Sequence, residues 1–86
     1  MYEVVFSKRF EKDLRKLLKK NPRLKNKVRK SVELLIKDPK HKSLRLHKLS
    51  GTNNWSLTVT MKIRIIFSIR GKRVLCTRIG THNEVY

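Results

Sequence analysis

The spacing of the apolar residues changes once along this chain, near residue 50, and this change restricts the folds that the chain can adopt. Before that point they recur every three or four residues, which is the period of an amphipathic helix. From Trp55 to Ile69 they alternate with polar residues, which is the period of a strand buried on one face. Helices followed by strands predict an α+β fold.

Two helices are expected in the first half of the chain. The first is expected over residues 8–20, after Ser7, whose hydroxyl suits an N-cap. The second begins at Asn21-Pro22 and ends at Asp38-Pro39, because a residue before proline is disfavoured in the helical conformation. Helices joined this closely form an antiparallel hairpin. Their apolar stripes consist of Phe10, Leu14, Leu17 and Leu18 in the first and Leu24, Val28, Val32 and Leu35 in the second.

Strands are expected on both sides of these helices. Residues 2–6 are rich in β-forming residues. Residues 55–61, 63–69 and 73–79 form an antiparallel meander with a turn at Gly71-Lys72. The prediction is therefore a small single α+β domain over residues 1–86, in the order βααβββ, with a two-helix hairpin packed on one face of an antiparallel sheet. The segment before residue 50 fits either a further short strand or an ordered loop.

The formal net charge of the chain is +17, from 23 lysines and arginines against 6 acids. Residues 8–48 hold 17 of the basic residues, and the only acids among them are Glu11, Asp13, Glu33 and Asp38. Such a field attracts the phosphates of nucleic acid, and it attracts an acidic protein equally well. The charge therefore predicts a polyanionic partner.

Cysteine content and hydropathy indicate the cellular compartment expected for this chain. Cys76 is the only cysteine, so an internal disulfide is excluded and a reducing cytoplasm fits. No basic leader precedes a long apolar run, and no apolar run exceeds three residues. Neither secretion nor membrane insertion is indicated, and a cytoplasmic location is expected.

Strand alternation predicts the position of two arginines. If the odd-numbered residues from 63 to 69 face the helices, Arg64 lies on the opposite, open face of the sheet. If Leu75, Thr77 and Ile79 also face inward, Arg78 lies on the open face as well. A guanidinium stays protonated and its planar fork matches phosphate oxygens. The pair is therefore suited to hold a phosphodiester and to stabilise charge that develops on it.

Groups that transfer protons lie near these arginines in the sequence. Gly80 permits a turn that brings His82 and Tyr86 back beside the sheet, and imidazole both gives and takes a proton near neutral pH. His47 and Lys48 supply a second proton carrier and a fixed charge. Cleavage of RNA through its 2′-hydroxyl needs a base, an acid and phosphate stabilisation, without a metal.

Other residues are expected to be structural. His41 is expected at the surface, Trp55 in the core or at its edge, and Cys76 within a strand. The histidines form no metal-binding motif, and neither nucleophile motifs nor phosphate-binding glycine loops occur. No metal and no cofactor are expected.

Five short motifs occur in order along the chain: Phe6-Ser7 before a basic helix, His47-Lys48-Leu49-Ser50-Gly51, Trp55-Ser56-Leu57, Ile63-Arg64-Ile65-Ile66-Phe67 and Ile79-Gly80-Thr81-His82-Asn83-Glu84-Val85-Tyr86. Together they resemble the RelE/ParE toxin superfamily and are most similar to its YafQ-like branch. The resemblance implies the toxin of a bacterial or archaeal type II toxin-antitoxin system. Such a toxin is a ribosome-dependent endoribonuclease that cleaves mRNA in the A site of the 70S ribosome through 2′-hydroxyl attack, leaving a cyclic phosphate. An acidic, partly disordered antitoxin is the implied protein partner, and the free toxin is expected to be a monomer.

The resemblance also implies roles for individual residues. By position, His82 is the leading acid or base, Arg64 and Arg78 stabilise the transition state, Tyr86 orients or stacks a base, and His47 assists. RNA contacts are expected from Lys42, Arg45, Lys48 and Lys62. Relatives often carry an arginine and an acid where this chain has Thr58 and Lys62.

Two alternative functions stay open. A ParE-like protein blocks DNA gyrase by protein contact without nuclease activity, and its branch generally lacks the histidine found here at 82. A non-catalytic nucleic-acid-binding protein needs only the basic helices. Replacing His82 by alanine separates the three functions, because it abolishes toxicity only for the endoribonuclease.

Overall fold

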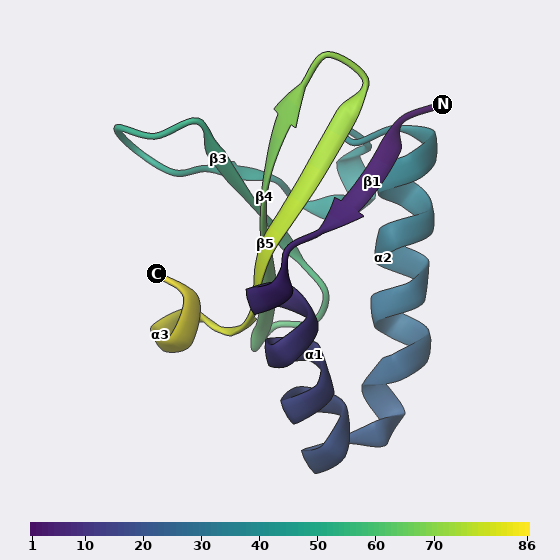
Figure 1. Ribbon diagram of the computed structural model, residues 1–86, viewed down its shortest axis with the longest axis vertical. Helices are drawn as coiled ribbons and strands as arrows, with labels where there is room; N and C mark the ends of the chain where they lie inside the picture. The colour runs from purple at the N-terminus through teal and green to yellow at the C-terminus, as the bar shows by residue number, and fades with distance from the viewer.

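The computed structural model describes all 86 residues, and it confirms the predicted succession of helices and strands. The elements are β1 (Glu3–Phe6), α1 (Lys8–Lys20), a 3-10 turn (Pro22–Leu24), α2 (Lys25–Lys37), a second 3-10 turn (Lys42–Leu44), β2 (His47–Lys48), β3 (Asn54–Thr58), β4 (Ile63–Arg70), β5 (Arg73–Thr81) and α3 (His82–Val85). Figure 1 shows α1 and α2 on one side of the sheet and the short α3 on the other. None of these helices combines the length and the apolar character that crossing a membrane requires.

The five strands form one sheet in the order β1-β5-β4-β3-β2. The meander from β2 to β5 is antiparallel throughout, as predicted. The edge strand β1 instead runs parallel to β5, with Val4 opposite Val74. Sequence periodicity does not reveal this direction, because side chains alternate in the same way in parallel and antiparallel strands. The ambiguous segment before residue 50 forms β2, a strand of only two residues at the other edge.

The core lies between the helix pair and the sheet. Ile63, Ile65 and Phe67 of β4 are buried and pack with Phe10 of α1 and Leu35 of α2. The predicted inward face of β4 is therefore confirmed. Burial of one side chain of this size contributes about 1.5–3 kcal/mol, so apolar packing holds the two highly charged helices against the sheet.

Ser7 caps α1, as predicted, and also ties it to the sheet. Its Oγ accepts a hydrogen bond of 3.0 Å from the backbone N–H of Phe10 and donates one of 3.1 Å to the carbonyl of Thr77. The same hydroxyl thus satisfies an orphan N–H of the helix and a carbonyl on β5. The start of α1 is fixed beside β5 in this way.

Two element boundaries differ from the prediction by three residues. The second helix starts at Lys25, because residues 22–24 form a 3-10 turn and the side chain of Asn21 makes no capping hydrogen bond. β3 ends at Thr58, and Met61 is 91% exposed. The hydroxyl of Thr60 accepts hydrogen bonds from the backbone of residues 62 and 63, which bends the chain into β4. The apolar alternation simply continues into this turn.

The predicted inward face of β5 is wrong for the first half of the strand. Val74 and Cys76 are buried, whereas Leu75 is 36% exposed. The cause is a bulge at Thr77: Phe67 of β4 pairs with Cys76, but the preceding residue of β4 pairs with residue 78. One extra residue shifts the side-chain phase by one position, so the second half of β5 has the predicted phase again.

Candidate functional site

A cavity opens on the face of the sheet that points away from α1 and α2. It measures about 420 Å³ and is lined by residues of β2, β3, β4 and the end of the chain. We call it the sheet cavity. Its lining consists of Arg45, Leu46, His47, Ser56, Thr58, Arg64, His82 and Tyr86. Five of the nine residues predicted for the site, two histidines, two arginines and the tyrosine, are brought together here.

His82 and Tyr86 lie one helical turn apart on α3 and contact each other. Their ring centroids are 4.1 Å apart in an edge-to-face arrangement of 70°. The hydroxyl of Tyr86 donates a hydrogen bond of 2.6 Å to Oγ of Ser56, which is buried in β3. The tyrosine thus fastens the end of α3 to the sheet, while its ring stays half exposed. An exposed imidazole stands beside it at the cavity.

The turn into α3 depends on Gly80, Thr81 and Glu84. The carboxylate of Glu84 accepts a hydrogen bond of 2.8 Å from the backbone N–H of Thr81, and the Thr81 hydroxyl caps the helix in return. Hydrogen bonds from Thr81 to the carboxyl group, first from its backbone N–H and then from its side chain, lower the pKa of Glu84. A Cβ on Gly80 would lie 2.9 Å from Oε1 of Glu84, so a larger residue there would displace this carboxylate from the N–H of Thr81.

Arg64 lies half-buried on the open face of the sheet, as the alternation predicts. Its Nη1 donates hydrogen bonds of 2.8 Å and 3.1 Å to the carbonyls of Thr60 and Met61. Because these bonds use only one nitrogen, the other N–H groups of the guanidinium are free to bind an anion. No Asp or Glu lines the sheet cavity, so the fixed charge of its side chains is positive.

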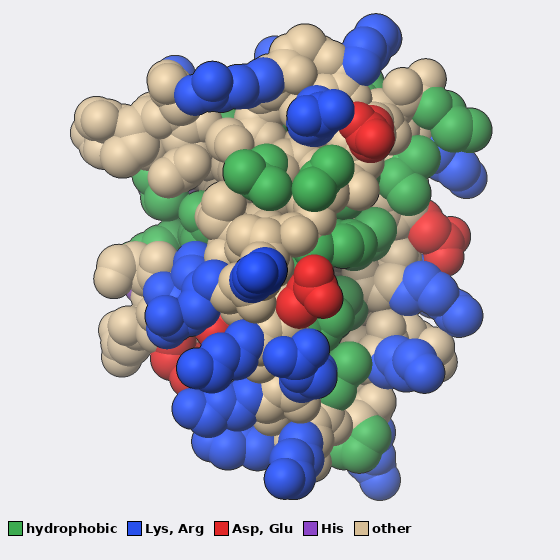
Figure 2. Space-filling model, in the orientation of Figure 1, with side chains coloured by type: hydrophobic (Ala, Val, Ile, Leu, Met, Phe, Trp, Pro, Cys, Tyr) green, Lys and Arg blue, Asp and Glu red, His purple; other side chains and the backbone are tan.

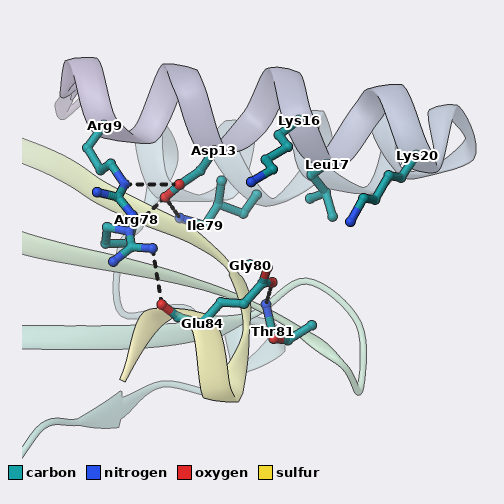
Figure 3. Close-up of a pocket in the computed structure, with 10 residues that line it drawn as sticks. All are labelled: Arg9, Asp13, Lys16, Leu17, Lys20, Arg78, Ile79, Gly80, Thr81 and Glu84. Atoms are coloured by element: carbon teal, nitrogen blue, oxygen red, sulfur yellow. Dashed lines mark hydrogen bonds and ion pairs between the residues drawn. The ribbon is translucent and has the colours of Figure 1, made fainter.

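The guanidinium of Arg78 enters a different cavity. This second cavity measures about 600 Å³ and lies between α1 and the segment Ile79–Glu84, as Figure 3 shows. We call it the helix cavity. Nε of Arg78 donates a hydrogen bond of 2.8 Å to Asp13, and Nη2 donates one of 3.1 Å to the carbonyl of Glu84. Arg64 and Arg78 therefore line separate cavities, although both were predicted to hold one phosphodiester.

Asp13 lines the helix cavity and was not predicted as a site residue. Burial alone would raise the pKa of Asp13, but hydrogen bonds from Arg78, from the N–H of Ile79 and from Arg9 outweigh burial and lower it. The charged form is thus favoured in a side chain that is only 13% exposed. A signal was present: Asp13 is an acid beside the apolar stripe of a helix whose other polar positions are mostly basic.

The remaining predicted residues lie outside both cavities. Lys42 lies in a 3-10 turn, and Lys62 is exposed in the turn before β4. Nζ of Lys48 lies 5.8 Å from the centroid of the Trp55 ring, and this ring packs against the core, as predicted. His41 accepts a hydrogen bond from the backbone N–H two residues later and so has a local structural role. No three His, Cys, Asp or Glu side chains are grouped to bind a metal.

Comparisons with solved structures support the fold. The chain resembles E. coli YafQ with a TM-score of 0.81 at 23% identity, over 100% of this chain and 99% of that one. It resembles a chain of the E. coli DinJ-YafQ complex with a TM-score of 0.82 at 24% identity, over 100% and 99%. It resembles a metal-bound toxin from Helicobacter pylori with a TM-score of 0.84 at 24% identity, over the full length of both chains.

Comparisons of the sequence add the family. No curated protein matches the chain. A family profile described as "Bacterial toxin of type II toxin-antitoxin system, YafQ" matches residues 2–86. The match includes every residue of both cavities. The chain therefore belongs to the YafQ family of toxins of bacterial type II toxin-antitoxin systems.

Proposed function

We propose that this protein is an mRNA interferase, a metal-independent endoribonuclease that cleaves mRNA in the ribosomal A site. The observation that carries the proposal is the sheet cavity, in which two imidazoles, two guanidiniums and a phenol line a space without side-chain carboxylates. These are the groups that transesterification at phosphorus requires: a base, an acid and a fixed positive charge.

The reaction starts from the 2′-hydroxyl of the RNA. One group of the site takes the proton of this hydroxyl, and the oxygen attacks the adjacent phosphorus. The bond from phosphorus to the 5′ oxygen breaks, and a second group protonates that oxygen. The products are a 2′,3′-cyclic phosphate and a 5′-hydroxyl. His47 and His82 are the candidates for the two proton transfers, because both line the cavity and imidazole serves in either direction near neutral pH.

Arg64 and Tyr86 support this chemistry. The free N–H groups of Arg64 stabilise the negative charge that builds on the phosphoryl oxygens in the transition state. The exposed face of Tyr86 stacks on a base next to the scissile bond. The bonds of Arg78 to Asp13 and Glu84 use two of its five N–H groups, and the other three are left for a neighbouring phosphate.

The basic surface binds the larger partners of the reaction. Figure 2 shows lysine and arginine side chains gathered over the part of the molecule that contains α1. In this proposal they contact ribosomal RNA, and Lys42, Arg45, Lys48 and Lys62 contact the mRNA. Since translated mRNA is the proposed substrate, the protein acts in the cytoplasm. We also propose that the free toxin is a monomer. The E. coli DinJ-YafQ complex supports an antitoxin as the protein partner. In this proposal the antitoxin is acidic and covers the same basic surface.

Wild type and His82→Ala, expressed under tight induction, test this proposal. Mapping the 5′ ends of cellular mRNA is expected to reveal in-frame cuts in translated messages with wild type only. His41→Ala is the matched control, because this histidine lies outside both cavities, and it is expected to cut like wild type. Growth arrest without cuts would instead indicate a gyrase inhibitor, and the absence of both effects would indicate a protein that only binds nucleic acid.

A further inference from the structure

The backbone groups of β5 that face β1 and α1 are hydrogen-bonded in two different ways along the strand. β1 pairs with β5 only as far as Cys76. Beyond that point side chains of the first helical turns take over: Ser7 bonds the carbonyl of Thr77, and Asp13 accepts a hydrogen bond of 3.2 Å from the N–H of Ile79. The carboxylate of Asp13 thus binds a backbone N–H of β5 beyond the last residue that pairs with β1.

The same oxygen of Asp13 also holds Arg78. Oδ2 accepts the hydrogen bond from Nε of Arg78, and the other end of that guanidinium reaches the carbonyl of Glu84 in α3 (Figure 3). An unbroken chain of contacts therefore runs from α1 through Asp13 and Arg78 to α3. His82 opens α3 and Tyr86 follows it directly, and both line the sheet cavity.

Asp13 is the only acid that pairs with Arg78. The helix cavity also contains Arg9, Lys16 and Lys20, and its other carboxylate, Glu84, is engaged by Thr81. Without the charge of Asp13, the guanidinium of Arg78 would face three cations and would move toward solvent. The hydrogen bond from Arg78 to α3 would be lost in that movement.

We infer that Asp13 is a positioning residue, which acts through Arg78 to hold the α3 segment, with His82 and Tyr86, against the open face of the sheet. Asp13 contacts neither the sheet cavity nor an RNA bound there. Its effect on cleavage rests on the proposed function, whereas its effect on the order of α3 does not.

The test combines backbone order parameters from ¹⁵N relaxation with cleavage kinetics. In wild type we expect values of about 0.85 for residues 82–85, and in Asp13→Asn values below about 0.6, with β4 unchanged in both. Cleavage by Asp13→Asn is expected to lose at least tenfold in kcat, because groups that react are displaced. The change in KM is expected to be smaller, because the basic side chains outside α3 keep their contacts with RNA. Glu11→Gln, an exposed acid of the same helix outside both cavities, is the matched control and is expected to behave like wild type.

Two further variants identify the route. Arg78→Lys keeps a positive charge but cannot bridge Asp13 and Glu84 at once, so it is expected to loosen α3 as Asp13→Asn does. Arg9→Ala removes the second ion-pair partner of Asp13 and is expected to leave α3 ordered. The double variant Asp13→Asn/Arg78→Lys is expected to be no looser than either single one, since both break one chain of contacts.

The inference is overturned if α3 keeps its order parameters in Asp13→Asn, or if Arg9→Ala loosens α3 to the same extent. Failure of the proposed function gives a different result, because wild type then does not cleave RNA while the order parameters still respond to Asp13. Should Asp13→Asn not fold, Arg78→Lys carries the same test.

Discussion

The phenol of Tyr86 donates a hydrogen bond of 2.6 Å to the hydroxyl of Ser56, a residue that is only 2% exposed. This bond joins the residue after α3 to β3, one of the inner strands of the sheet. It anchors the aromatic ring by one end and leaves half of its surface accessible.

Separate replacements of Tyr86 distinguish the hydroxyl from the ring. Tyr86→Phe removes the anchor, and we expect it to lower the free energy of unfolding by about 1 kcal/mol and cleavage by less than tenfold. Tyr86→Ala also removes the stacking surface, which is worth about 1–3 kcal/mol, so cleavage is expected to fall roughly 5- to 150-fold. Urea titration and kcat/KM on ribosome-bound mRNA measure the two effects. Equal losses in both variants would assign a chemical role to the hydroxyl.

Arg64→Ala is expected to lower kcat by about 10²–10³, the usual cost of removing one group that stabilises a transition-state oxyanion. Single-turnover cleavage measures this loss. Arg73→Ala serves as the control, because Arg73 is exposed at the far end of β5 and pairs only with Glu3. If the two arginine variants cleave equally well, Arg64 does not stabilise the phosphoryl group.

Phe67→Ala is expected to destabilise the protein by about 3–5 kcal/mol, since this fully buried ring lies in the centre of the core. Met61→Ala, in the exposed turn before β4, is expected to change stability by no more than about 0.5 kcal/mol. Chemical denaturation followed by circular dichroism compares them. A stable Phe67→Ala protein would contradict the assigned core.

Acid is expected to weaken the contribution of Asp13. Its pKa is lower in the folded protein than in the unfolded chain, so the carboxylate stabilises the fold above its unfolded pKa, near 3.8. The contribution is lost as the pH falls through the still lower folded pKa. The difference in unfolding free energy between wild type and Asp13→Asn should therefore be constant near neutral pH and shrink below about pH 4. A difference that stays constant down to pH 2 would show that the charge of Asp13 is not stabilising.

Burial raises the pKa of the Cys76 thiol to about 12, so the reactive thiolate is almost absent at neutral pH. A thiol reagent is expected to label Cys76 only when the protein unfolds, at a rate that increases with denaturant. Labelling in guanidinium chloride gives the reference rate. Rapid labelling of the native protein would mean that the first half of β5 opens locally.

Local signals were sufficient to predict most of the fold. The observed limits of α1 agree with the predicted ones, because Ser7 and Asn21 mark its two ends and the apolar stripe lies between them. The hairpin at Gly71-Lys72 was predicted correctly, because turn residues there join two strands in which apolar and polar residues alternate. The bulge at Thr77 was not predictable, since its extra residue has a side chain that fits either face of a strand.

The composition of the sheet cavity was also predicted in part. His47, Arg64, His82 and Tyr86 meet there because strand alternation and the turn after Gly80 direct them to one face. The placement of Arg78 in a different cavity from Arg64 was not predicted, because it depends on Asp13, an ion-pair partner 65 residues earlier in the chain. Pairings across such distances leave no periodic pattern.

The parallel pairing of β1 with β5 also has a consequence for the timing of folding. Ser7 and Thr77, which join the two segments, lie 70 residues apart. Ribosomes add about 5–20 residues per second, so β1 waits roughly 4–14 seconds during synthesis before its partner strand exists. The sheet cavity needs residues that are made later still. The groups proposed to cut RNA therefore come together only after Tyr86 has been added to the nascent chain, and every shorter nascent chain lacks the complete sheet cavity.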